Sequence, residues 1–168
     1  MGGMLAAEMA AIEPRRVKKL VLVGAAGLWL DDCTTADFFA MTPEELVEAA
    51  LYDPQSDLAK AFLALPQDKD AANEVMIQRL KGFAAAGRFL WPLPDRGLSE
   101  RLYRVKAPTL LLWGEGDTII PVRYAQAFCD FLTSSAAVKV ELIARAGHMV
   151  LLEQTQAATR AIREFCRA

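Results

Sequence analysis

His148 is the only histidine among the 168 residues, so imidazole chemistry at neutral pH must use this side chain. It comes shortly after a predicted strand at residues 138–143. Asp117 follows an apolar run, residues 109–113, in a glycine-rich turn. A buried carboxylate beside an imidazole fixes the tautomer of the ring and stabilises its protonated form. The two side chains are therefore candidates for an acid–base pair.

Two apolar runs, residues 18–25 and 109–113, are typical of strands buried on both faces, which is the pattern of a parallel sheet. Residues 138–143 (VKVELI) predict a third strand. Helix-forming segments separate them, and strands that alternate with helices predict an α/β fold. The helices are expected at residues 3–13, 43–51, 56–65, 69–86, 121–132 and 154–166, with Gly87 ending the fourth and a loop over 88–97.

Asp117 and His148 are separated by 31 residues (148 − 117), enough for one crossover helix and one strand. The carboxyl ends of parallel strands meet at one edge of the sheet, where open α/β sheets bind ligands. We therefore expect the two side chains to form a hydrogen bond. Two other interpretations stay open. Asp117 could serve only an Asx-type turn, or the carboxylate could come from Glu115, Asp31 or Asp32.

The composition excludes several classes of protein. The net charge of −2 argues against a protein that binds nucleic acid, because phosphate binding needs clustered Lys and Arg. No apolar run is long enough to span a membrane, and no GxGxxG or P-loop motif suggests a nucleotide site. The cysteines lie far apart, which predicts reduced thiols in a cytoplasm and neither a disulfide framework nor a metal site. They are Cys33, Cys129 and Cys166.

The segments APTLLLWGEGD (107–117), Ile120-Pro121 and AGHM (146–149) resemble the C-terminal part of an α/β-hydrolase-fold enzyme. The resemblance implies that Asp117 and His148 are the last two members of a Ser-Asp-His triad, with no metal or cofactor. It also implies three parts: a core helix and strand (1–29), a helical cap or lid (30–105), and core strands and helices that carry the Asp and the His (106–168).

The beginning, Met1-Gly2-Gly3, resembles the residues that follow the nucleophile in the G-x-S-x-G elbow of that family. The resemblance therefore implies that the serine precedes Met1 and that the Met1 amide serves in the oxyanion hole. None of the serines of the chain lies in a G-x-S-x-G setting; these are Ser56, Ser99, Ser134 and Ser135.

The resemblance implies a parent enzyme that hydrolyses a small apolar ester or another activated carbonyl compound, and this chain alone is expected to be inactive. The alternative is a non-catalytic chain. It would be a truncated or split product that packs with a complementary N-terminal half, or a binding protein on a hydrolase scaffold. Because an open sheet edge invites pairing, we also expect self-association.

Overall fold

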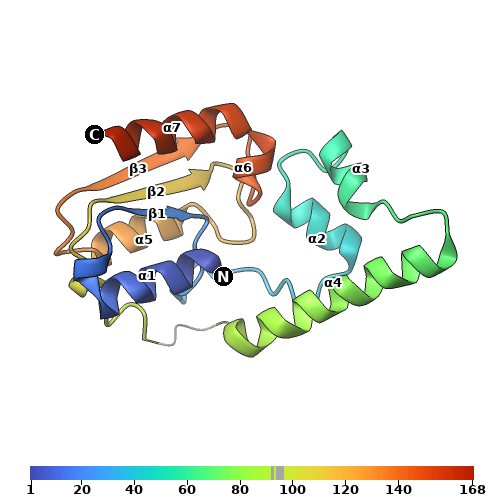
Figure 1. Cartoon of the computed structure of the whole chain (residues 1–168), viewed down its shortest axis with the longest axis horizontal. Coiled ribbons are helices and arrows are strands. Elements are labelled where there is room, and N and C mark those ends of the chain that lie inside the picture. Colours follow the sequence, from blue (N-terminus) through green and yellow to red (C-terminus); the bar gives the residue numbers. More distant parts are fainter. Residues whose placement is uncertain (92, 94–96) are drawn as a thin grey trace.

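The structure is a computed structural model, and it describes residues 1–91, 93 and 97–168. Three parallel strands and the helices between them follow one another along the chain (Figure 1). The elements in order are α1 (Gly2–Ile12), η1 (Pro14–Arg16), β1 (Leu20–Val23), α2 (Pro43–Ala50), α3 (Asp57–Leu63), α4 (Lys69–Leu90), η2 (Leu102–Arg104), β2 (Thr109–Gly114), α5 (Arg123–Phe131), β3 (Val138–Ile143), α6 (Val150–Glu153) and α7 (Thr155–Arg167).

The sheet has the order β1-β2-β3, and both pairings are parallel. Leu22 pairs with Leu111, which in turn pairs with Val140. The predicted α/β class and the three predicted strands are thus confirmed. All three strands end at the same edge, which brings the turns after β2 and β3 together (Figure 1).

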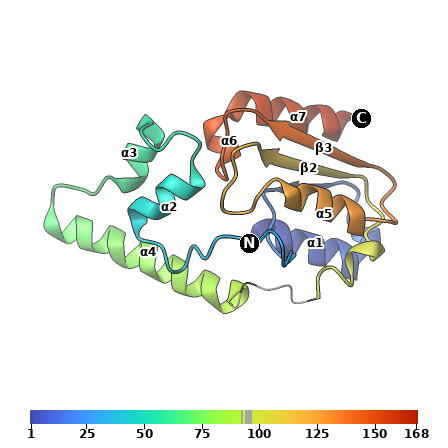
Figure 2. The same ribbon diagram turned by 180° about the vertical axis from the view of Figure 1, so that it is seen from behind.

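Alternate residues of the strands face two different helical layers. On one face, Leu22, Leu111 and Trp113 pack in a cluster with residues of α1 and α5. On the other face, Leu112 and Ile143 pack against α7. Figure 2 shows α1 and α5 from behind, where they cover their side of the sheet. This two-sided burial explains the continuous apolar runs of β1 and β2, whereas β3 is a partly exposed strand that contains Lys139 and Glu141.

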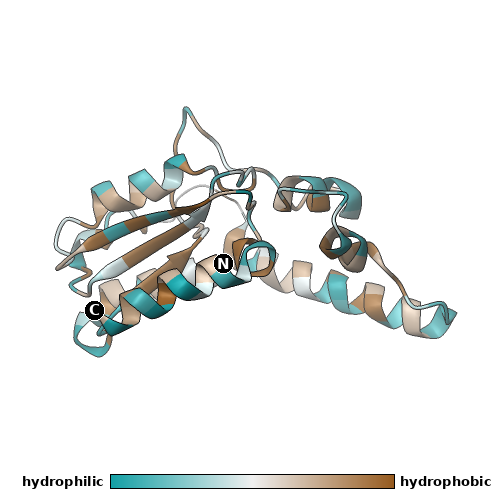
Figure 3. Cartoon of the chain, turned by 90° about the horizontal axis from the view of Figure 1, so that it is seen from above, coloured by the Kyte–Doolittle hydropathy of each residue, from teal (hydrophilic) through white to brown (hydrophobic). Residues whose placement is uncertain are grey.

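α2, α3 and α4 project away from the sheet layers (Figure 3). α2 begins with a capping box, in which Thr42 Oγ1 accepts from the Glu45 amide and the Glu45 carboxylate accepts from the Thr42 amide. Side-chain oxygens of Ser56 and Asp68 cap α3 and α4 in the same way. These polar caps account for the good agreement between the predicted and observed beginnings of the three helices.

The prediction that Gly87 ends the fourth helix is wrong, because α4 continues to Leu90. The carbonyl of Gly87 accepts a hydrogen bond from the amide of Trp91, so the glycine lies inside the last turn. Trp91 then adopts an extended ψ of 135°, as expected of a residue that precedes a proline. The loop predicted over 88–97 therefore begins three residues later than predicted, at Trp91. Residues 92 and 94–96 of that predicted loop lie outside the described residues.

The structure also contains α6, a short helix before α7 that the sequence did not predict. β1 lies at one end of the strand order and pairs only with β2 within the described part of the chain. Beside it, α1 leaves the side chains of Leu5, Met9 and Ile12 exposed. No helix among the described residues is both long and apolar enough to cross a membrane.

Candidate functional site

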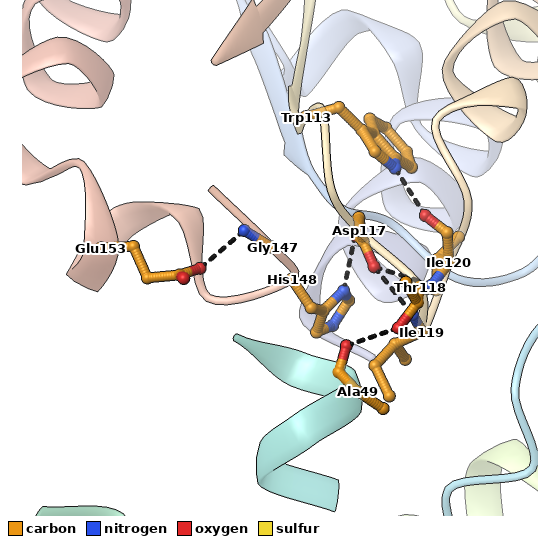
Figure 4. Close-up of polar contacts among 9 residues, drawn as sticks. All are labelled: Ala49, Trp113, Asp117, Thr118, Ile119, Ile120, Gly147, His148 and Glu153. Carbon is orange, nitrogen blue, oxygen red and sulfur yellow. Dashed lines mark hydrogen bonds and ion pairs between the residues drawn. The ribbon is translucent and has the colours of Figure 1, made fainter. Parts of the chain in front are cut away.

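Asp117 and His148 meet at the carboxyl edge of the sheet (Figure 4). Nδ1 of His148 lies 2.8 Å from Oδ2 of Asp117. The Asp117 side chain is 1% exposed, whereas that of His148 is 26% exposed. The imidazole therefore contacts a buried carboxylate on one side and is partly exposed to solvent.

The second carboxylate oxygen of Asp117 holds the turn after β2. Oδ1 accepts from the amides of Ile119 and Ile120 at 3.0 and 2.9 Å, and Trp113 Nε1 donates to the Ile120 carbonyl at 2.9 Å. The Asx-type turn and the Asp–His pair therefore occur together, with one oxygen for each. This arrangement fixes the carboxylate without using the oxygen that faces His148.

The pair determines which imidazole nitrogen is available for proton transfer. A buried carboxylate accepts from Nδ1–H, so the neutral ring carries its lone pair on Nε2. Among the residues that the structure describes, no hydrogen-bond partner is recorded for Nε2 of His148. That nitrogen can accept a proton from a hydroxyl placed against it.

Gly24, at the end of β1, lies directly against this pair. A Cβ atom added there would lie 3.1 Å from His148 Nδ1 and 3.3 Å from Asp117 Oδ2. Its φ of +47° is also one that L side chains rarely adopt. Sequence reasoning placed Gly24 at the strand end but not in the site. A glycine at the carboxyl end of a buried strand was the available signal.

The turns after β2 and β3 also pack closely on each other. A Cβ atom at Gly114 would collide with the carbonyl oxygens of Ala146 and Gly147. The glycine thus allows the end of β2 to touch the segment that carries His148. This close approach places the Asp117 turn directly beside the His148 turn.

The C-terminal end of α2 contacts both turns. Thr118 Oγ1 donates to the Ala49 carbonyl at 2.8 Å, and the Met149 amide donates to the Ala50 carbonyl at 3.2 Å. The Glu153 carboxylate accepts from the Gly147 amide (Figure 4). Sequence reasoning missed Thr118 and Glu153. The only signal was that Glu153 is the single charge closing an apolar run after His148.

The rival carboxylates have other neighbours. Asp31 accepts from Trp29 Nε1 at 3.1 Å, and Asp32 forms an ion pair with Arg123 at 2.7 Å. Glu115 is exposed on the turn. None of the three has a recorded bond to His148, so the geometry favours Asp117.

Met1 lies before α1, on the side of the sheet where the strands end (Figure 1). A Cβ atom at Gly3 would lie 2.7 Å from Cβ of Ala25, so the beginning of α1 packs against the residues that follow β1. Burial lowers the pKa of the Met1 N-terminal ammonium. A helix N-terminus also favours negative charge, as an oxyanion site requires.

Two serines have side-chain partners away from the pair. Ser56 caps α3, and Ser135 Oγ donates to the Ala107 carbonyl at 2.7 Å, just before the strands β2 and β3 begin. The three cysteines are free, and the described residues contain no group of three potential metal ligands.

A large cavity lies between α2, α3 and α4 rather than at the pair. It has a volume of about 1170 Å³ and a mainly apolar lining that includes Phe39, Phe62, Leu80, Phe83 and Trp91. Asp117 and His148 do not line it. The helices thus present an apolar surface that is separate from the Asp–His pair.

Several relatives match almost the whole chain. A 2-hydroxy-6-oxononadienedioate/2-hydroxy-6-oxononatrienedioate hydrolase of Comamonas testosteroni is 26% identical, with 98% of this chain and 59% of that protein covered. A 2-hydroxy-6-oxo-6-phenylhexa-2,4-dienoate hydrolase of the same species is 25% identical, with 99% and 60% covered. The chain thus spans about 60% of the length of these curated relatives.

Solved structures of hydrolases share the fold. A 2-hydroxy-6-oxo-6-phenylhexa-2,4-dienoate hydrolase from Rhodococcus superimposes with a TM-score of 0.70 at 21% identity, covering 100% of this chain and 62% of that one. A thermophilic esterase gives a TM-score of 0.67 at 22% identity, covering 98% and 62%. These likenesses confirm an α/β-hydrolase fold of partial length. Residues 1–155 match the family described as Serine aminopeptidase, S33, and the chain therefore belongs to that hydrolase family.

Proposed function

We propose that this chain supplies the acid–base half of a Ser-His-Asp hydrolase site. The observation that carries the proposal is the contact of 2.8 Å between His148 Nδ1 and Asp117 Oδ2 at the carboxyl edge of the sheet. Open α/β sheets hold their active sites at this edge. Asp117 would orient His148, and Nε2 would take and return the proton.

The proposed reaction follows from these positions. A serine hydroxyl attacks the carbonyl carbon while His148 Nε2 accepts its proton. The protonated imidazole gives that proton to the leaving group, and water then hydrolyses the acyl-enzyme by the same route. The main-chain nitrogen of Met1 would donate to the oxyanion. In this proposal the serine precedes Met1, because Met1-Gly2-Gly3 resembles the residues that follow the nucleophile in the G-x-S-x-G elbow.

The proposed substrate is a small ester or activated carbonyl compound with an apolar acyl part. The apolar cavity between α2, α3 and α4 supports this class. These helices lie between β1 and β2 in the sequence, and in this proposal they form the cap over the site. Two relatives named above are, by name, hydrolases of 2-hydroxy-6-oxo dienoate compounds, which are carbonyl compounds. The chemistry needs no metal or organic cofactor. The free cysteines fit a reducing cytoplasm.

A second candidate is a non-catalytic chain that pairs with a complementary N-terminal half or with itself. The open edge of β1 and the exposed apolar residues of α1 favour it. Unpaired strand groups are a template for another strand. Sedimentation would show a dimer or larger species on this account. A monomer with a sharp, reversible thermal transition would contradict it.

The test of the catalytic proposal has two parts. The isolated chain should neither hydrolyse a short-chain acyl ester nor react at serine with a fluorophosphonate probe. The second part uses a longer chain, encoded by any in-frame sequence upstream of Met1 that ends in Gly-x-Ser. That chain should hydrolyse the ester, and His148→Ala should lower kcat by about 10³-fold or more.

Glu115→Gln is the control, since Glu115 neighbours Asp117 in sequence and is exposed. It should leave kcat within about twofold, as expected for a surface substitution. Full activity of the His148→Ala variant, or labelling of a serine in the isolated chain, would contradict the proposal.

A further inference from the structure

The carboxylate of Glu153 joins two segments that lie far apart in the sequence. Oε1 accepts from the amide of Tyr52 at 2.6 Å, and Oε2 accepts from the amide of Gly147 at 2.7 Å. Both distances are short, as expected when the acceptor is charged. Each oxygen therefore holds one backbone segment.

The two segments are the end of α2 and the turn that carries His148. Tyr52 comes two residues after Ala50, the last residue of α2, and Gly147 immediately precedes His148. A Cβ atom at Gly147 would lie 2.7 Å from the Ala50 carbonyl oxygen and 2.9 Å from the Tyr52 nitrogen. The two segments thus touch, with the Glu153 carboxylate between their amide groups.

Two further hydrogen bonds reinforce this junction. The terminal carbonyls of α2 have no partner within the helix, as at any helix end. The Ala49 carbonyl accepts from Thr118, next to Asp117 (Figure 4). The Ala50 carbonyl accepts from Met149, next to His148. Both members of the Asp–His pair therefore have a neighbour bonded to α2.

We propose that Glu153 is a positioning residue that couples α2 to the His148 turn. Glu153 then fixes the position of α2 relative to the position of the imidazole. The requirement is for a carboxylate, because each of its oxygens accepts one amide proton. In a glutamine, one of these oxygens is replaced by an NH2 group, which cannot accept, and the other loses its charge, so both bonds weaken. The consequence for catalysis rests on the proposed role of His148.

Hydrogen–deuterium exchange of the Glu153→Gln chain tests the coupling, and it does not require a monomer. Peptides that contain Tyr52 and Gly147 should both exchange about tenfold faster at those amides than in the wild type, the expected result of losing a charge-assisted bond. Carbethoxylation of His148 should also become faster. The absorbance of the carbethoxylated imidazole reports on His148 alone, because the chain has no other histidine.

Glu48→Gln is the matched control. It removes the same charge from an exposed position of α2, and exchange at Tyr52 and Gly147 should not change. In the wild type, both amides should exchange slowly although they lie outside helices and strands. Fast exchange at either amide in the wild type would overturn the proposal.

Faster exchange of Gly147 alone in Glu153→Gln, or a uniform rise across the core strands, would also overturn it. The first result would mean a local role and the second a general loss of stability. The exchange measurement does not depend on turnover, so its failure and the failure of the catalytic proposal are distinguishable.

Discussion

The sheet with its flanking helices and the helices α2 to α4 bury their apolar side chains to very different degrees. Leu111 and Trp113 of β2 are fully buried. In contrast, α4 has 22 residues, and Leu90 is its only buried one within the described part of the chain. Leu80, in the middle of α4, is 67% exposed. The region that fixes the Asp–His pair is thus rigidly packed, whereas the helices present apolar surface to solvent.

This difference indicates that the two regions have different roles. A pair that must hold a hydrogen bond needs a frame in which strand register sets every position. The helices carry short polar caps and an apolar cavity, which suit a surface that contacts an apolar group. Contiguous exposed apolar surface of this kind marks ligand or protein contacts.

The largest expected difference in stability comes from replacing one leucine by alanine in each region. Leu111→Ala should lower the free energy of unfolding by about 2–5 kcal/mol, because it empties a fully buried site. Leu80→Ala should change it by less than about 0.5 kcal/mol, because the side chain is already exposed. Urea denaturation of the two variants measures both. Equal losses would show that α4 is buried against something in solution.

Replacing a glycine by alanine in each region should change the stability by smaller amounts, with opposite signs in the two regions. Gly24→Ala should destabilise the chain by about 1–3 kcal/mol, since φ is +47° there and the new methyl would press on His148. Gly82→Ala, in α4, should stabilise by about 0.5–1 kcal/mol, because nothing lies within 4 Å and alanine favours a helix. Thermal unfolding compares them. A neutral Gly24→Ala would contradict the described packing at the pair.

The smallest effect concerns Tyr124, a fully buried residue of α5. Desolvation raises its pKa above the ordinary value of 10.0, although the Leu30 amide, which donates to its hydroxyl, lowers it. The stabilisation is fully present below the pKa of the unfolded chain and is lost as pH rises through the folded pKa. Thermal midpoints should therefore fall above about pH 10.

Tyr124→Phe is the control for that measurement, because it removes the titrating group and keeps the ring. Its thermal midpoint should fall less steeply with pH above this value than that of the wild type. Identical slopes would show that Tyr124 ionises equally easily in the folded and unfolded chains.

Much of the site could be predicted because it depends on local patterns. Asp117 and His148 each follow a predicted strand, and parallel strands end at one edge whatever their neighbours are. The beginnings of α2, α3 and α4 were predicted within one residue, because polar capping residues directly precede each helix.

The rest depends on contacts between distant residues. Glu153 bonds to Tyr52 across 101 positions, and no periodicity in either segment announces that contact. Gly24 belongs to the site only because β1 lies beside β2, which brings its backbone against the His148 ring. Gly87 was misread because a helix can contain glycine when the next break, here at Trp91, is determined by Pro92.

Proton NMR of the imidazole tests the central claim most directly, because His148 is the only histidine of the chain. A hydrogen bond from Nδ1 to a buried carboxylate should give one exchangeable proton resonance far downfield. We expect this resonance in the wild type and in Glu115→Gln, and we expect its loss in Asp117→Asn. Its absence from the wild type, or its persistence in Asp117→Asn, would contradict the pairing of Asp117 with His148.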